Sequence, residues 1–213
     1  MIESNIIFED LFIIPLIRVV VNENTFELED DNNRTILSNN DFFLDNRGEQ
    51  KNKDFRVLEN YPNTKNILLK YIRSSLNKLG YVSEFDISTS WCTESSKGDF
   101  SAAHNHKNSW FSAVYYYGDY DENSGKFFIQ NPLSDLTGFM DRVNHYNKFN
   151  RGETVIPPQK KHMIIFPSYL KHGISPHKSD LTRYSLAMNI VPVGIYGQYD
   201  STYDTSWYGE GKK

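Results

Sequence analysis

The chain has 213 residues, with 23 Lys and Arg against 27 Asp and Glu, so its formal net charge is -4. This near balance argues against a general nucleic-acid-binding protein, which usually carries a basic stripe. No stretch reaches the ~18 apolar residues of a membrane-spanning helix, and the single cysteine, Cys92, excludes an intramolecular disulfide and a multi-cysteine zinc site. We therefore expect one domain, residues 1–213, with no nucleic-acid partner and no membrane association.

Residues 1–84 predict a strand, a polar loop and a helix. Residues 12–21 are apolar and rich in β-branched side chains, which is typical of a buried strand. Residues 22–54 are crowded with Asn, Asp and Glu, a composition that favours turns and loops. Within 64–79 apolar residues recur at helical spacing, and Gly80 follows as a stop signal.

After Gly80 the apolar pattern changes to a period of two, which predicts strands. The first strand would present one face made of Phe85, Ile87, Thr89 and Trp91. Four further strands are predicted at 111–117, 126–130, 163–166 and 183–191. Short strands with frequent turns are typical of a sandwich or jelly roll. Residues 85–193 would form this core, with an insertion at 133–154 and an irregular tail at 194–213.

Two of the six histidines stand in the tripeptide His104-Asn105-His106. In an extended chain residues i and i+2 project from the same face, so both imidazoles can converge on one metal ion. His172 follows the strand predicted at 163–166, and strand pairing in a jelly roll would bring it to the barrel mouth as a third ligand. His177 is the reserve candidate. Hydrogen-bonded structural histidines are the competing interpretation.

The last predicted strand opens with Arg183-Tyr184-Ser185. Alternate residues share a face, and a guanidinium beside a hydroxyl suits a carboxylate that is held by two hydrogen bonds. A buried arginine without a partner would be costly. The pattern therefore predicts an anionic ligand here.

Taken together, these motifs resemble the iron(II)/2-oxoglutarate-dependent oxygenases related to prolyl hydroxylases, a family of bacteria and phages. The resemblance covers residues 85–193 and rests on the order and spacing of four segments: 104–116, Gly125-Lys126-Phe127-Phe128 with Pro132, Phe166-Pro167-Ser168 with His172, and Arg183-Tyr184-Ser185 with Asn189. It implies a mainly β fold, a cupin-like jelly roll called a double-stranded β-helix, with one or more supporting N-terminal helices. It also implies a site that uses iron(II), 2-oxoglutarate and dioxygen.

On this resemblance the iron ligands are His104, His106 and His172. The usual ligand set of the superfamily is His-x-Asp/Glu followed by a distal His, whereas this chain has His106 at the carboxylate position. Three-histidine iron sites occur in cupin-type dioxygenases, so His106 is kept as a ligand. Asp99 or Asp119 would be its replacement.

The resemblance assigns Arg183, assisted by Ser185, to the remote carboxylate of 2-oxoglutarate. Tyr115 or Tyr117 would donate to the same group if alternate tyrosines of this strand line the barrel interior, and plain core packing is the alternative for both. Asn108 would either contact the cosubstrate or cap a turn.

The predicted activity is 2-oxoglutarate- and iron(II)-dependent hydroxylation of a small-molecule or peptide substrate, in the family's manner an amino-acid or peptidyl (prolyl-like) group. Two alternatives stay open. One is a three-histidine cupin-type dioxygenase that does not use 2-oxoglutarate, and the other is a non-catalytic jelly-roll binding or virion module. Arg183 with Ser185 favours the 2-oxoglutarate-dependent oxygenase over the cupin-type dioxygenase, because the latter needs no clamp for a remote carboxylate. Metal content would distinguish the binding module, which should purify without stoichiometric metal. We expect the protein to be located in the cytoplasm of a bacterium or of a phage-infected host cell. The sequence is compatible with a homodimer.

Overall fold

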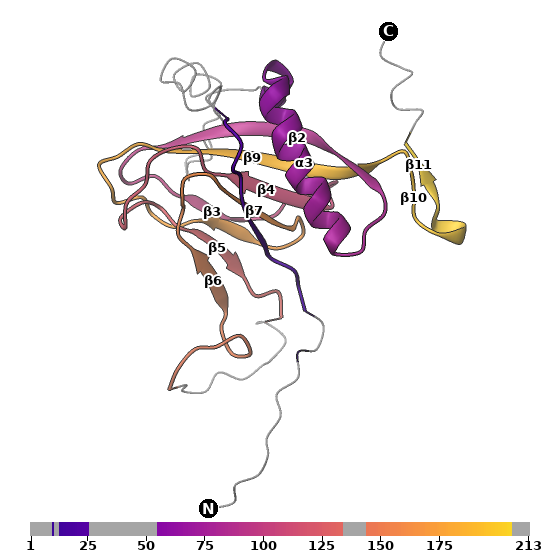
Figure 1. Ribbon diagram of the computed structural model, residues 1–213. Coiled ribbons are helices and arrows are strands. Elements are labelled where there is room, and N and C mark those ends of the chain that lie inside the picture. Colours follow the sequence, from indigo (N-terminus) through magenta and orange to yellow (C-terminus); the bar gives the residue numbers. More distant parts are fainter. Residues whose placement is uncertain (1–9, 11–12, 26–54, 134–143, 206–213) are drawn as a thin grey trace, which may run out of the picture.

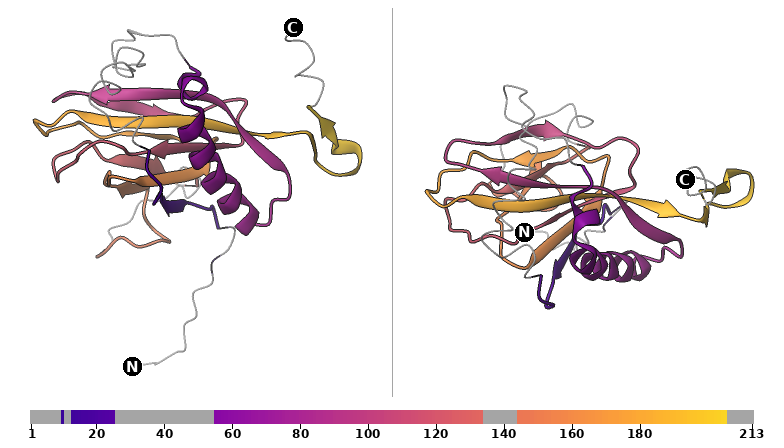
Figure 2. Two further views of the ribbon diagram at one scale, coloured as in Figure 1. Left: turned by 45° about the horizontal axis from the view of Figure 1, so that its top comes forward. Right: turned by 90° about the horizontal axis from the view of Figure 1, so that it is seen from above.

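The computed structural model describes residues 10, 13–25, 55–133 and 144–205 (Figure 1). Two antiparallel sheets lie face to face, and one helix crosses the outer face of the larger sheet (Figure 2). The larger sheet has the strand order β1-β7-β4-β9-β2 and the smaller one β3-β8-β5-β6. A hairpin of β10 and β11 extends from the end of β9 (Figure 1). The prediction of a mainly β fold is confirmed.

The larger sheet consists of β1 (Ile17–Val20), β7 (His162–Pro167), β4 (Phe111–Tyr115), β9 (Arg183–Val193) and β2 (Glu84–Ser95). The smaller sheet consists of β3 (Ser101–His104), β8 (His172–Ile174), β5 (Phe127–Gln130) and β6 (Glu153–Ile156). The other elements are η1 (Val57–Asn60), α3 (Pro62–Lys78), β10 (Ile195–Tyr196), η3 (Tyr199–Ser201) and β11 (Tyr203–Asp204).

The helix predicted at 64–79 is confirmed as α3, which starts two residues earlier, at Pro62. Proline is favourable in a first helical turn because its missing N–H has no partner there anyway. Leu68, Ile72 and Leu76 are fully buried against the larger sheet. Gly80 follows with a φ of +92°, a left-handed conformation that glycine adopts without steric cost, and it ends the helix.

The larger sheet is buried on both faces. On one side its residues pack under α3, where Ile165 and Met188 belong to the outer core. On the other side Val114 and Phe166 meet Phe127 of the smaller sheet in the inner core between the two sheets. All five residues of β4 are buried. Since both faces of β4 are apolar, its sequence does not reveal which residues face the interior between the sheets.

A β-bulge interrupts β2, because Ile87 pairs with Ile190 whereas Thr89 already pairs with Asn189. An extra residue in one strand reverses the alternation of side chains beyond it. Ile87 therefore lies in the outer core, as Phe85 does, while Trp91 lines the cavity between the sheets. The prediction that these residues share one face is wrong.

Several predictions fall partly outside the described residues. The strand predicted at 12–21 forms at Ile17–Val20. Residues 26–54 of the polar loop, 134–143 of the insertion and 206–213 of the tail are not among the described residues. At the end of the insertion, Glu153 and Thr154 belong to β6. The proposed division of the chain stays a prediction. In the described ranges no helix is long and apolar enough to cross a membrane.

Candidate metal centre and cosubstrate cavity

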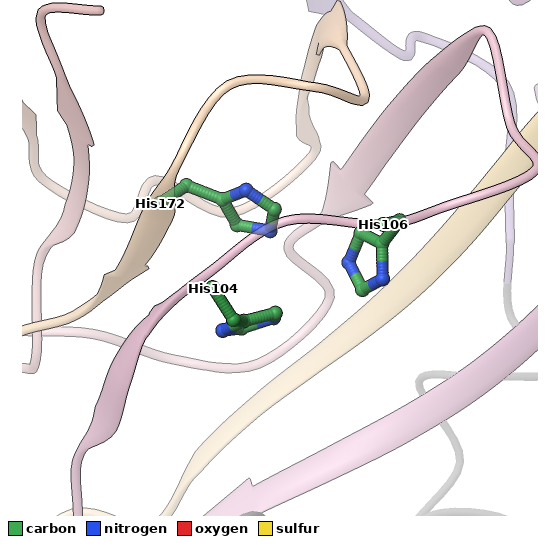
Figure 3. Close-up of side chains that lie close together, drawn as sticks. All are labelled: His104, His106 and His172. Carbon is green, nitrogen blue, oxygen red and sulfur yellow. The ribbon is translucent and has the colours of Figure 1, made fainter.

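Three histidines from two segments of the chain, 104–106 and the start of β8, converge at one end of the smaller sheet (Figure 3). His104 ends β3 and His172 begins β8, and the two residues are partners in this antiparallel pair. His106 lies two residues further on, where its backbone N–H donates to the carbonyl of Ser168 at 3.1 Å. One ring nitrogen of each histidine lies within 4.8 Å of those of the other two. The structure thus brings together all three predicted ligands.

Backbone carbonyls orient two of these rings. The Nδ1–H of His104 donates to the carbonyl of Ala102 at 2.8 Å, and the Nδ1–H of His172 donates to that of Leu170 at 2.9 Å. A carbonyl only accepts, so in both rings Nδ1 carries the proton and Nε2 keeps a free lone pair. The His106 ring packs edge-on against Trp91. This donor set fits a divalent transition metal.

Burial keeps two of the imidazoles neutral. It lowers the pKa of His106 to about 4, and the charge of the neighbouring His104 acts in the same direction. Burial lowers the pKa of His172 to about 3, although the hydrogen bond to Leu170 opposes the shift. Only neutral imidazole binds a metal ion. Both side chains are therefore in the ligand form at neutral pH.

The three rings border a cavity of about 100 Å³ between the two sheets. Its wall is largely aromatic and aliphatic and includes Trp91, Phe100, Val114, Phe127 and Phe166. Hydroxyl groups of Thr93, Ser112 and Ser185 interrupt this wall, and Arg183 also lines the cavity. Metal ligands and a cation thus face one mostly apolar space.

Arg183 is only 1% exposed, which is unusual for a charged side chain. Its Nε donates to the carbonyl of Gly125 at 3.0 Å, and its Nη1 donates to Oγ of Ser185 at 3.1 Å. Its Nη2 has no hydrogen-bond partner, and no ion pair among the described residues includes it. An unpaired buried cation is costly, so this group suits an anion in the cavity.

Thr93 is a cavity residue that the sequence did not indicate. It stands opposite Ser185 in the pairing of β2 with β9, and the two hydroxyl oxygens lie 2.6 Å apart. Ser185 is thereby held between Thr93 and Arg183. Only the register of the two strands reveals this contact, because no local pattern marks Thr93.

The tyrosines at the end of β4 and just after it are oriented differently from the prediction. Tyr115 lies in the outer core, where its hydroxyl pairs with that of Thr25 at 2.8 Å, and Tyr117 lies in the same core. Neither residue lines the cavity, and Tyr116 is not among its lining residues either. Tyr116 faces the inner core instead, with its ring centroid 5.4 Å from Cζ of Arg183. Burial raises the pKa of Tyr116 and Arg183 partly opposes this, so the hydroxyl keeps its proton.

The remaining candidates lie outside the metal centre. Asn108 is exposed in a turn with a φ of +59°, a left-handed conformation that asparagine tolerates. Asp99 borders the cavity, but its carboxylate accepts the N–H of Ser96 at 2.7 Å, and Asp119 pairs with Lys160 at 3.1 Å. His177 uses both ring nitrogens in hydrogen bonds to the backbone, so it is not a ligand.

Residues 89–189 match the model of the 2OG-Fe(II) oxygenase family, and this segment contains all three histidines, Arg183 and Ser185. No curated protein sequence matches the chain.

Several solved structures align with the chain. The viral collagen prolyl hydroxylase of Paramecium bursaria Chlorella virus-1, in complex with 2-oxoglutarate, aligns at a TM-score of 0.50 with 14% identity, covering 84% of this chain and 96% of that protein. HygX of Streptomyces hygroscopicus, with nickel, 2-oxoglutarate and hygromycin B bound, aligns at 0.52 with 11% identity, covering 84% and 83%. An oxygenase of Burkholderia pseudomallei aligns at 0.40 with 17% identity over 52% of this chain, which spans only 47% of that protein. The alignments at TM-scores of 0.50 and 0.52 confirm the predicted jelly-roll fold.

Proposed function

We propose that the chain is a 2OG-Fe(II) oxygenase in which His104, His106 and His172 hold the iron and Arg183 binds 2-oxoglutarate; the match over residues 89–189 and the shared fold support this. One observation carries the proposal. A single cavity is lined both by three converging imidazoles and by a buried guanidinium whose Nη2 lacks a partner. The first group suits a metal ion and the second a carboxylate, and the cosubstrate needs both.

The histidine cluster fits iron(II) in number and in chemistry. Imidazole is a common ligand of iron, and an ion held by three ligands on one side keeps further positions open. Such an ion would have room to bind 2-oxoglutarate and dioxygen beside the three imidazoles. With His106 in place of a carboxylate, the protein supplies no negative charge to the metal among the described ligands.

Arg183 is held in position before any ligand arrives. Gly125 and Ser185 fix its Nε and Nη1, which leaves Nη2 as the donor for the remote carboxylate. Tyr116 lies beside the guanidinium and can add its hydroxyl. Hydrogen bonds to charged groups each stabilise by roughly 1.5–3 kcal/mol. A clamp that is already oriented loses little entropy on binding.

When bound, iron and 2-oxoglutarate supply the oxidation, in which dioxygen converts 2-oxoglutarate to succinate and carbon dioxide and gives its second oxygen atom to a C–H bond. The residues of the chain orient these partners and exclude water. Trp91, Phe127 and Phe166 form an aromatic wall close to the histidines, with Trp91 against His106 and Phe166 against His172.

We further propose that the substrate is an amino-acid or peptidyl group of the prolyl type, which the enzyme hydroxylates. The shared fold with a collagen prolyl hydroxylase supports this choice, as does an aromatic cavity wall that suits an aliphatic ring. The cytoplasmic location and the homodimer stay predictions.

Two measurements test the proposal. Calorimetry on the manganese-loaded protein under anaerobic conditions should show binding of 2-oxoglutarate, and the iron-loaded protein in air should form succinate. Mass spectrometry of proline-containing peptides, with alanine-substituted peptides as controls, should then show the gain of one oxygen atom at proline. If the metal-loaded protein does not bind 2-oxoglutarate, the assigned site is wrong. If succinate forms but no prolyl peptide is modified, only the substrate class is wrong.

A further inference from the structure

We propose that His177 is a positioning residue for the cosubstrate clamp: it holds Gly125, and the carbonyl of Gly125 holds Arg183. The inference rests on the proposed function, because it concerns the arginine assigned to 2-oxoglutarate. His177 touches neither the histidine cluster nor the guanidinium in any contact of the described residues, and it lies five residues beyond His172. Its role is therefore transmitted through the backbone.

The ring of His177 is 1% exposed and both of its nitrogens are used. Nδ1 accepts the backbone N–H of Gly125 at 2.9 Å, and Nε2 lies 2.6 Å from the carbonyl oxygen of Leu181. Since a carbonyl only accepts, Nε2 carries the proton and Nδ1 carries the lone pair. These two bonds require a neutral imidazole in one tautomer, which a simple space-filling side chain would not reproduce.

The backbone of His177 is itself anchored. Its N–H donates to the carbonyl of Asp99 at 2.8 Å, and its carbonyl accepts the N–H of Gly98 at 2.7 Å. The following residue, Lys178, donates its N–H to the carbonyl of Asn123 at 2.9 Å. The imidazole thus projects from a segment that is tied to two other loops, so it can fix the position of Gly125.

Gly125 connects the imidazole to the clamp. Its N–H donates to His177, and its carbonyl accepts from Nε of Arg183 at 3.0 Å. The next N–H, that of Lys126, donates to Oγ of Ser175 at 2.9 Å, so both peptide groups around Gly125 are held. A Cβ atom at position 125 would lie 2.8 Å from the carbonyl oxygen of Ser175, which only glycine avoids. The carbonyl that orients Arg183 therefore has little freedom to move.

The direction of the guanidinium depends on this arrangement. Arg183 has two fixed bonds, at Nε and Nη1, and these leave Nη2 for the ligand. If Gly125 shifts, the Nε bond weakens and the guanidinium is held by Ser185 alone. The guanidinium then adopts several orientations, of which only one binds the carboxylate. Because only a fraction of the protein is competent to bind, the apparent affinity for 2-oxoglutarate falls.

Two substitutions separate the bonds of His177. In His177→Gln the amide nitrogen reaches the place of Nε2 and keeps the bond to Leu181, but the acceptor for Gly125 is lost. In His177→Asn the amide oxygen takes the place of Nδ1 and keeps the bond to Gly125, while the bond to Leu181 is lost. A general loss of packing would affect both variants. A positioning role through Gly125 affects the Gln variant more.

The experiment measures binding of 2-oxoglutarate to the manganese-loaded full chain by calorimetry, with the affinity for manganese measured separately. Because one buried hydrogen bond contributes roughly 0.5–1.5 kcal/mol, we expect the dissociation constant for 2-oxoglutarate to rise about three- to tenfold in His177→Gln. In His177→Asn the rise should be smaller, and the affinity for manganese should not change in either variant. Equal affinities of parent and Gln variant, or a larger loss in the Asn variant, would overturn the inference.

A double-mutant cycle with Arg183→Ala tests whether the effect passes through the arginine. Residues that act through one another are not additive. In the Arg183→Ala background, His177→Gln should therefore not weaken the binding of 2-oxoglutarate any further. If the losses of affinity in the two single variants add up in the double variant, transmission through Arg183 is refuted. If His177→Gln does not fold, Ser175→Ala replaces it in the cycle, because it releases the other peptide group of Gly125. Failure of the proposed function is distinct from all these outcomes, because the parent itself would then not bind 2-oxoglutarate.

Discussion

His104 and His172 face each other across the antiparallel pair of β3 and β8, with ring centroids 4.6 Å apart. Each ring donates its Nδ1–H to a carbonyl two residues earlier in its own segment. One strand pair thus sets both the separation and the orientation of two ligands that are far apart in sequence. The third ligand, His106, is positioned by the hydrogen bond from its backbone N–H to the carbonyl of Ser168.

His172→Ala should abolish stoichiometric binding of iron(II) or manganese, because two remaining imidazoles cannot complete the site. Calorimetry with manganese checks this. The matched control is His162→Ala, since the His162 ring lies outside the cluster and is hydrogen-bonded to the carbonyl of Lys160 at 3.1 Å. Unchanged affinity in His172→Ala would remove this residue from the ligand set.

Arg183→Ala should weaken binding of 2-oxoglutarate and spare metal binding. Truncating one partner of a buried charge pair costs on the order of 2–5 kcal/mol, or roughly 30- to 5000-fold in affinity. Arg183→Lys should recover only part of the loss, because an ammonium lacks the planar fork that Gly125 and Ser185 hold. Titration of the metal-loaded protein gives the affinities, and Arg18→Ala on the exposed side of β1 is the control. A parent-like affinity in the Ala variant contradicts the clamp.

Tyr116→Phe should lower the affinity for 2-oxoglutarate about threefold to tenfold, since one hydrogen bond near its carboxylate is lost. Tyr115→Phe should leave this affinity unchanged and lower the free energy of unfolding by about 1 kcal/mol, because its hydroxyl pairs with Thr25 in the outer core. Calorimetry and urea unfolding separate the two effects. The reverse pattern would show that Tyr115 and not Tyr116 faces the ligand.

The metal-free protein should lose stability as the pH falls below about 6.5, the ordinary pKa of histidine. Burial lowers the pKa of His106 to about 4 and that of His172 to about 3 in the folded chain. Between these values and 6.5 the unfolded chain binds protons that the folded chain does not, so the free energy of unfolding decreases with falling pH. Their contribution is complete above 6.5 and disappears progressively towards pH 3–4.

Urea unfolding at pH 7 and pH 5 measures this dependence. His172→Gln should make it shallower, because one titrating group is removed, and His162→Gln serves as the control outside the cluster. An identical pH dependence in parent and His172→Gln would mean that the folded His172 is protonated as easily as the unfolded one.

The spacing of residues within single elements was sufficient to predict much of the site. The i, i+2 spacing places Arg183 and Ser185 on one face of β9, and the structure has them in a hydrogen bond at 3.1 Å. Helical spacing with a terminal glycine predicted α3 to within two residues at its start. These features depend on the backbone geometry of one element, which the residues of that element determine.

The face of β4 and the partners of single residues were decided by the tertiary structure. Both faces of β4 are covered, so apolar character does not distinguish Tyr115, its last residue, from Tyr116, which follows it. The bulge in β2 moves Trp91 to the cavity side, and it becomes visible only when Ile87 and Thr89 are paired with β9. Which face of the sheet a side chain occupies, and where a bulge forms, is determined by the neighbouring strands and not by the residues of one strand alone.

The sequence by itself determined the ligand types, the imidazole pair of His104 and His106, and the mainly β class, because these follow from short-range spacing and periodicity. The tertiary structure places His172 in the cluster, as strand pairing in a jelly roll predicted, and it alone decided that His177 serves Gly125 and that Thr93 supports Ser185. The physical reason is that these contacts join segments tens of residues apart. Their geometry is set by strand register and by the burial of hydrogen-bonding groups that each need a partner.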